Sequence, residues 1–379
     1  MKEVIYLDNA ATTALDPQVL EEMLPFMTTH FGNPSSSYSI GRTTRSAVET
    51  ARRKVAGLLG VKPTTVFFTS GGTESNNTAI SSAINDLGCN HVITSPIEHH
   101  AVLYTVEHHC KRNSLSSSFV ALLPNGEVDY NDLEAQLATQ QAAGKKCLVS
   151  LMHANNEIGS LLNLKLVGEL CQTYNAIFHS DCVQTVGHYP IDLGEYNVHF
   201  ISAAGHKFHG PKGTGVLYVN EAIKANPLIL GGGQERNMRA GTENLYGIVG
   251  FAKALEIAVE NFDKESSYIT SLNTYMKEKL MAAVPDVSFN NPQNSLYTVL
   301  SVCFAPNTQT DMLLLKLDMA GVCASGGSAC SGDGGSHVIK ALNRLANGTT
   351  IRFSFSKYTT TADIDKAVET IALELQERS

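Results

Sequence analysis

The stretch Phe200-Ile201-Ser202-Ala203-Ala204-Gly205-His206-Lys207-Phe208 joins an apolar strand candidate to a lysine just beyond its end. One residue further on, the segment 210–213 adds two glycines and a proline. Surroundings of this kind can desolvate an amine and make it nucleophilic. Most lysines are only solvated charges, so the meaning of Lys207 depends on what lies opposite it.

Asp181 is the first candidate to lie opposite Lys207. It follows the strand candidate 176–180, stands 26 positions before the lysine (207 − 181), and is followed by Gln184 three positions later. Because the carboxyl ends of parallel strands meet at one edge of a sheet, we expect the carboxylate and the amine to share a site. A buried aspartate is usually a cap or an ion-pair partner. Opposite a lysine-bound aldehyde cofactor, however, it can keep a pyridine nitrogen protonated.

The remaining apolar runs predict the fold class. Runs with strand character lie at 66–68, 92–94, 147–152, 177–179, 200–201 and 216–218, with helix-like stretches between them and a clear helical period at 44–59. This alternation predicts an α/β fold in which helices cover both faces of a large, mostly parallel sheet.

A second pattern begins after about residue 250. Two long helical stretches, 248–261 and 266–283, precede strand candidates at 297–304 and 350–355 and a final helix from Thr361. We expect a large cofactor-binding α/β domain over 16–256, and a small α+β domain over 1–15 plus 257–379 that carries a cysteine-containing loop.

Composition excludes several classes of protein. The 379 residues are 43% hydrophobic and 17% charged, with a net charge of −8. No apolar run approaches the roughly 18 residues of a membrane span, and no dense basic run favours nucleic-acid binding. The N-terminus lacks the order of a signal peptide, so we expect a soluble, cytoplasmic protein with no membrane or nucleic-acid partner. Eight cysteines without paired metal-ligand spacing predict reduced, mostly buried thiols and no metal site.

The segment Thr69-Ser70-Gly71-Gly72-Thr73-Glu74-Ser75-Asn76 follows a strand candidate and opens a helical stretch. Glycines there admit close backbone approach, and the first N–H groups of a helix attract anions. An ordinary capped turn has the same pattern, and neither the Rossmann nor the Walker spacing is present. The segment is therefore a candidate phosphate cradle.

Cys330 and Arg352 stand out near the C-terminus. Segment 325–336 around Cys330 holds five glycines and no bulky apolar residue, so we expect an exposed, reactive thiol on a flexible loop. Cys323 follows an apolar run and is expected to be buried. Arg352 falls on the polar face of strand candidate 350–355. An arginine there is normally solvated, but its planar guanidinium group could also bind a carboxylate through two hydrogen bonds.

Ten motifs share the order and spacing of one family, namely Tyr6-Leu7-Asp8-Asn9-Ala10-Ala11-Thr12-Thr13, Gly32-Asn33-Pro34-Ser35-Ser36, Ser70 to Asn77, Glu98-His99, His153 to Gly159, Asp181, Gly205-His206-Lys207, Arg239-Ala240-Gly241-Thr242, Gly327-Ser328-Ala329-Cys330 and Arg352. Through them, essentially the whole chain resembles the cysteine desulfurases of the NifS/IscS type, within the class V aminotransferases.

The resemblance implies a fold-type I pyridoxal-phosphate transferase that forms a homodimer, with a mostly parallel sheet of the seven-stranded type. It implies conversion of L-cysteine to L-alanine, with the sulfur held as a persulfide on an enzyme cysteine. The resemblance also implies a partner that takes up the sulfur, either a sulfur-acceptor or an iron-sulfur scaffold protein, and hence iron-sulfur cluster assembly as the pathway.

The resemblance also implies residue roles. Catalytic roles fall to Lys207 as the Schiff-base lysine, Cys330 as the persulfide thiol and His99 as the imidazole stacked over the ring, chosen over His100 because it follows the glutamate. Cofactor contacts are implied for Lys207, Gly72, Thr73, Asn156, Asp181, Gln184, His206 and, from the opposite subunit, Thr242. Substrate contacts are implied for Arg352, Asn33 and Asn156.

Some positions depart from the family pattern. Ala204 stands where a phosphate-contacting serine is usual, which removes one hydrogen bond worth on the order of 1 kcal/mol. Tyr38 replaces a histidine, and Ser356 and Lys357 replace a Gly-Arg pair. Three alternatives stay open at this point: a selenocysteine lyase, a class V aminotransferase without a persulfide step, and a non-catalytic sulfur-assembly scaffold.

Overall fold

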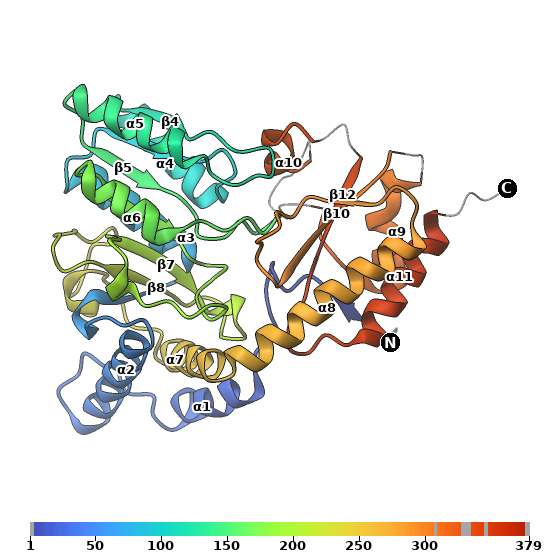
Figure 1. Ribbon diagram of the computed structural model, residues 1–379. Coiled ribbons are helices and arrows are strands. Elements are labelled where there is room, and N and C mark those ends of the chain that lie inside the picture. Colours follow the sequence, from blue (N-terminus) through green and yellow to red (C-terminus); the bar gives the residue numbers. More distant parts are fainter. Residues whose placement is uncertain (1–3, 307–308, 327–334, 345–347, 376–379) are drawn as a thin grey trace.

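The computed structural model describes residues 4–306, 309–326, 335–344 and 348–375. Figure 1 shows two regions, one built on a large sheet and one on a small sheet, joined along the long helix α8 (Phe262–Ala283) and by the N-terminal segment. The two sheets have separate apolar cores.

The large sheet has seven strands in the order β2-β8-β7-β6-β5-β3-β4. Only β8 runs antiparallel to its neighbours, so the predicted α/β fold with a mostly parallel sheet is confirmed. The strands are β2 (Val66–Thr69), β3 (His91–Thr94), β4 (Ser116–Phe119), β5 (Cys147–Ser150), β6 (Ile177–Asp181), β7 (Phe200–Ala204) and β8 (Gly215–Val219).

Edge strand β4 is the one strand of the large sheet that the apolar runs did not predict. Its sequence is Ser-Ser-Ser-Phe, and its side chains alternate between half-buried and exposed. It pairs on one side only, with β3. A strand of this kind needs little apolar character, because no second strand and no continuous core cover it.

Helices cover both faces of this sheet, as predicted. One face packs on α1 (Pro17–Thr28), α2 (Ser39–Leu58), α5 (Tyr130–Ala142), α6 (Leu164–Thr173) and α7 (Leu245–Glu260). The other face packs on α3 (Gly72–Asn85) and α4 (His100–Asn113). Neighbouring residues such as Phe200 and Ile201 therefore belong to opposite cores, as strand alternation requires.

The small sheet is antiparallel, in the order β12-β10-β9. Its apolar side packs against α8 and α11, and β1 pairs in parallel with β11 nearby. The remaining elements are β1 (Ile5–Tyr6), β9 (Ser288–Phe289), β10 (Val299–Phe304), α9 (Leu313–Ala320), β11 (Val322–Cys323), α10 (His337–Ala341), β12 (Thr349–Ser354) and α11 (Thr361–Leu375).

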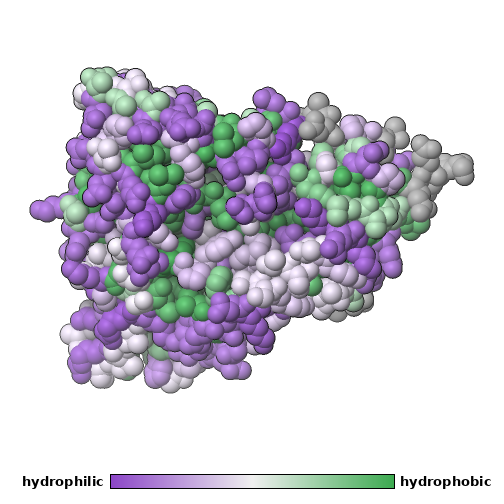
Figure 2. All heavy atoms as spheres, in the orientation of Figure 1, coloured by the Kyte–Doolittle hydropathy of each residue, from purple (hydrophilic) through white to green (hydrophobic). Residues whose placement is uncertain are grey.

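Figure 2 shows one face of the molecular surface. Hydrophilic residues dominate the outer edges of the face in Figure 2, and hydrophobic residues show between them in patches. Within the described ranges, no helix combines the length and the apolar character needed to cross a membrane.

The described cysteines are all free thiols, and most are buried. Cys323 is only half-buried, so the prediction of a buried side chain was wrong; its two-residue strand lies beside the exposed Tyr6.

Candidate active site

A cavity of about 290 Å³ opens at the carboxyl ends of the parallel strands β5, β6 and β7. The first turn of α3, the N-terminal segment and Arg352 of β12 complete its wall. This is the edge at which parallel sheets place their ligands. Nine predicted site residues line it: Gly72, Thr73, His99, Asn156, Asp181, Gln184, His206, Lys207 and Arg352.

Lys207 ends the short 3₁₀ turn Gly205–Lys207 that follows β7. Its Nζ donates hydrogen bonds to the carbonyl oxygens of Ala10 (2.7 Å) and Ala11 (2.8 Å). The Gln184 side-chain amide donates to the same Ala10 oxygen at 3.0 Å. The N-terminal segment therefore crosses the site and supplies the carbonyls that orient the amine.

Asp181 is the last residue of β6 and is 6% exposed. Its Oδ1 accepts from the Val183 backbone N–H at 2.9 Å, and its Oδ2 accepts from the Asn76 side-chain amide at 2.6 Å. Two N–H donors therefore fix the position of this carboxylate. The predicted convergence of Asp181 and Lys207 on one cavity is found in the structure.

The candidate phosphate cradle also adopts the expected geometry. Helix α3 begins at Gly72 after Gly71, which has a φ of 150° and no capping side chain. A Cβ on Gly72 would lie only 2.5 Å from Val183 Cγ2, so a larger residue would fill the space. The N–H groups of the first helical turn have no intrahelical acceptors and face an anion site by default. Ala204 lines the same cavity without offering a hydroxyl.

Two histidines on the cavity wall are held in their neutral form. His99 caps α4, and its Nδ1 accepts from the Ala101 backbone N–H at 3.1 Å, which leaves the ring proton on Nε2. Burial, with the Lys207 charge adding to it, lowers the His99 pKa against the opposing pull of Asp181. Burial, followed by the charges of Lys207 and Lys212, lowers the pKa of His206 to about 4.

Arg352 is buried, at 3% exposure, and its guanidinium already has partners. Its Nη2 pairs with Asp8 Oδ1 at 2.7 Å, and its Nη1 donates to the Asn156 carbonyl at 2.8 Å. Its Nε is buried without a hydrogen-bond partner. Each Nη still carries a second N–H, and Arg352 lines the cavity, so this pre-oriented guanidinium can also bind an incoming carboxylate.

Three predicted residues do not lie on this wall. Thr242 lines a separate cavity near Arg239 and Glu235. The Asn33 side chain is exposed, and its Oδ1 accepts from the Ser35 N–H. Cys330 lies outside the described residues.

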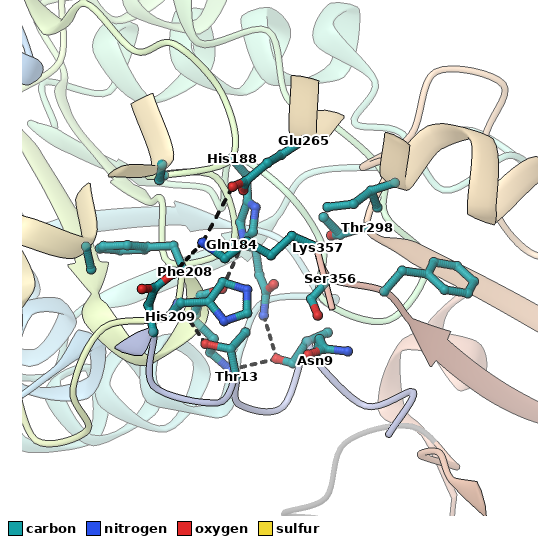
Figure 3. Close-up of a pocket in the computed structure, with 18 of the residues that line it drawn as sticks. Asn9, Thr13, Gln184, His188, Phe208, His209, Glu265, Thr298, Ser356 and Lys357 are labelled. Carbon is teal, nitrogen blue, oxygen red and sulfur yellow. Dashed lines mark hydrogen bonds and ion pairs between the residues drawn. The ribbon is translucent and has the colours of Figure 1, made fainter. Parts of the chain in front are cut away.

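Behind Lys207 lies a second, much smaller cavity of about 20 Å³, drawn in Figure 3. Its wall includes Lys357, whose Nζ lies 2.7 Å from Asp16 Oδ2 and 3.5 Å from Glu265 Oε1 (Figure 3). Asp16 caps α1 and Glu265 belongs to α8. Lys357, one of the departures from the family pattern, therefore ties the N-terminal segment to the long helix of the small region.

The sequence interpretation missed two residues that hold the site together. Asn76 supports Asp181, and Asp8 supports Arg352. Both occur in motifs quoted above, but neither spacing nor residue type indicated which partner each would reach.

The residues present fit pyridoxal phosphate. The cavity offers an amine in Lys207, an anionic acceptor in Asp181 for a ring nitrogen, and a glycine-lined helix start that a Cβ at Gly72 would fill. Within the described ranges, no group of three or more His, Cys, Asp or Glu side chains could hold a metal ion.

Comparison with known proteins agrees with this chemistry. The chain is 42% identical to the protein named cysteine desulfurase IscS of Dictyoglomus turgidum, over 98% of this chain and 94% of that one. It is 39% identical to the protein of the same name from Methanosarcina thermophila, over 97% and 91% of the two chains.

Solved structures give the same result. A NifS-like protein superposes with a TM-score of 0.90 at 36% identity, over 98% of this chain and 99% of the other. A structure described as SspA in complex with cysteine superposes with a TM-score of 0.81 at 31% identity, over 95% of this chain and all of the other. The family model for aminotransferase class V, a family of pyridoxal-phosphate enzymes, matches residues 5–367. The chain therefore belongs to the aminotransferase class V family.

Proposed function

We propose that this protein is a pyridoxal-phosphate-dependent cysteine desulfurase that converts L-cysteine to L-alanine and retains the sulfur as an enzyme persulfide. The observation that carries the proposal is the convergence of Lys207, Asp181 and Arg352 on one cavity. Full-length relatives named cysteine desulfurase support the choice of reaction within the family.

The cofactor, when bound, supplies an electron sink for the electrons released at the substrate α-carbon. We assign Lys207 to hold the cofactor aldehyde and, once released by the substrate, to take the α-proton. Asp181 would accept a hydrogen bond from the ring nitrogen of the cofactor, and Gln184 and Asn156 would contact its ring oxygen. Gly72, Thr73 and His206 would hold its phosphate.

Arg352, Asn156 and Asn33 are the proposed substrate contacts. The Arg352 fork binds the substrate carboxylate, which fixes the α-carbon relative to Lys207. His99, whose Nε2 carries the ring proton, would stack on the cofactor ring and could donate a hydrogen bond to the substrate.

Cys330 is the proposed sulfur acceptor. Its thiolate attacks the substrate sulfur, the carbon–sulfur bond breaks, and the electrons of that bond stay on the carbon that becomes the alanine methyl group. One thiol and one cysteine thus yield one persulfide and one alanine, with no external oxidant or reductant.

A homodimer completes the proposal. Thr242 does not line the cavity of its own chain and carries an alcohol that suits phosphate binding in a neighbouring subunit. We also retain the division into a large domain over 16–256 and a small domain over 1–15 plus 257–379, which the two separate apolar cores support. The proposed location is the cytoplasm, and the proposed acceptor is an iron-sulfur scaffold or another sulfur-acceptor protein.

The decisive experiment is to purify the protein with pyridoxal phosphate, trap the cofactor on the protein with borohydride, and add L-cysteine with a thiol reductant. We expect equal amounts of alanine and sulfide. Lys207→Ala should abolish both the trapped chromophore and the products. Cys330→Ser should keep the spectral response to cysteine and lose sulfide release.

Each alternative predicts a different result. A class V aminotransferase would form a keto acid instead of alanine, and a selenocysteine lyase would release selenium from selenocysteine with little turnover of cysteine. A scaffold would stay colourless after incubation with the cofactor. Full sulfide release by Cys330→Ser would refute the role of that thiol.

A further inference from the structure

A directed chain of buried hydrogen bonds runs behind the cavity and ends on Asp181. It consists of Ser150, His179, Asn76 and Asp181, which are 0%, 0%, 1% and 6% exposed. Ser150 Oγ lies 2.8 Å from His179 Nδ1, His179 Nε2 lies 3.1 Å from Asn76 Oδ1, and Asn76 Nδ2 lies 2.6 Å from Asp181 Oδ2.

The fold brings these groups together in a simple way. His179 and Asp181 are two residues apart on β6, so strand alternation places them on the same face of the sheet. Ser150 lies directly opposite His179 on the neighbouring strand β5. Asn76 reaches them from the second turn of α3, the helix that packs over this face.

The direction of each hydrogen bond follows from the charge on Asp181. An ionised carboxylate only accepts, so the Asn76 amide nitrogen must face Asp181 and its oxygen must face His179. That oxygen also only accepts, so His179 carries its proton on Nε2. Its Nδ1 is then free to accept from the Ser150 hydroxyl. Burial lowers the His179 pKa to about 3, which agrees with a neutral ring in this position.

A neutral Asp181 would weaken this order. Hydrogen bonds to an ionised acceptor are roughly twice as strong as neutral ones, so protonation would weaken the bonds that Asp181 accepts from Asn76 and Val183. Buried donors that are poorly matched are costly away from water. The series of hydrogen bonds from Ser150 to Asp181 therefore favours the ionised form of the Asp181 carboxylate.

We propose that Asn76 and His179 are positioning residues that keep Asp181 ionised and aimed into the cavity, and so keep the cofactor ring nitrogen protonated. The inference rests on the proposed role of Asp181 towards that nitrogen. It adds two residues that act through Asp181: Asn76 lies beside it on the cavity wall, and His179 is fully buried behind Asn76.

The test uses holoenzyme loaded with pyridoxal phosphate that is 15N-labelled at the ring nitrogen. The 15N chemical shift reports the protonation of that atom directly and does not depend on turnover. We expect a protonated nitrogen in the wild type. Asn76→Leu, which keeps the number and branching of the side-chain heavy atoms and removes the amide, should move the signal towards the unprotonated form and lower kcat about tenfold, with KM for cysteine within twofold.

Matched variants separate this role from general damage. Asn77→Leu makes the same change one residue along α3, where the side chain donates to the Thr73 carbonyl instead, and should leave the ring-nitrogen signal at its wild-type position. His179→Gln keeps an N–H donor for Asn76 and should retain most of the protonated signal, whereas His179→Leu should lose it.

An Asn76→Leu holoenzyme with a fully protonated ring nitrogen and wild-type kcat would overturn the proposal. If that variant does not fold, the His179 pair decides the matter: identical nitrogen signals in His179→Gln and His179→Leu would also overturn it. A wild-type protein that binds the cofactor with a protonated ring but forms no alanine would refute the proposed function and leave this inference standing.

Discussion

Glu235→Gln should destabilise the protein more than any surface charge substitution, because it breaks a buried ion pair. Glu235 is 4% exposed and Arg52 is 1% exposed. The two carboxylate oxygens accept from Arg52 Nη1 (2.7 Å) and Nη2 (2.8 Å), and the Phe68 backbone N–H donates to one of them at 2.8 Å. The pair also holds residues 235–237, which all have positive φ, in a backbone conformation that non-glycine residues avoid.

The expected magnitude follows from these contacts. Removing one partner of a buried pair costs about 3 to 5 kcal/mol. Because Arg52 keeps a second carboxylate, Glu49 at 3.0 Å, we expect the lower end, about 3 kcal/mol. At about 2.1 cal/mol/K of unfolding entropy per residue, a chain of this length has roughly 0.8 kcal/mol/K, so the melting temperature should fall by about 4 °C.

Circular dichroism of the holoenzyme at fixed cofactor concentration, in heat and in urea, measures this loss. Arg236→Ala is the matched control, because it breaks a partly exposed pair with Glu49 and should cost less than about 1 kcal/mol. If Glu235→Gln loses no more stability than Arg236→Ala, the buried pair does not stabilise this loop as reasoned here.

Three further predictions test the site. Arg352→Lys, which cannot reproduce a planar fork, should raise KM for cysteine by roughly tenfold or more with a smaller change in kcat, and an unchanged KM would contradict a carboxylate-binding role. Ala204→Ser should restore one phosphate hydrogen bond and tighten cofactor binding about fivefold in equilibrium dialysis, for about 1 kcal/mol, whereas Ala203→Ser on the opposite face should not. Burial lowers the pKa of His179 from 6.5 to about 3, so between these values the unfolded chain binds a proton that the folded chain does not. The contribution of His179 to the free energy of unfolding is therefore complete above pH 6.5 and falls as the pH drops from 6.5 towards about 3. In His179→Gln, the urea concentration at the unfolding midpoint should depend less steeply on pH in this range. An unchanged pH dependence would show that another group causes it.

The chain order of apolar runs was enough to predict most of the large sheet. Strands β5 and β6 are buried on both faces, and their apolar residues, such as Leu148, Val149 and Phe178, stand out in the sequence. Strand β4 escaped notice because an edge position tolerates Ser116, Ser117 and Ser118. Helix α2 starts at Ser39, five residues before its expected start, since its first turn is largely exposed and lacks apolar periodicity.

Much of the site could be predicted because its residues follow strands. The carboxyl ends of β6 and β7 lie side by side in the sheet, so Asp181 and Lys207 converge for a topological reason that sequence order already contains. The glycines before α3 indicate close backbone approach in the same direct way. Local sequence therefore determined most of the sheet, the helix that begins at Gly72, and the meeting of Asp181 with Lys207.

Only the tertiary structure decided which partners those groups have. Asp8 and Arg352 are separated by 344 residues, and Asn76 and Asp181 by 105. The direction of the hydrogen bonds from Ser150 through His179 depends on all of these groups at once. No local pattern encodes such pairs, because burial rewards whichever polar groups the packed elements bring within hydrogen-bond distance, and penalises any that remain alone.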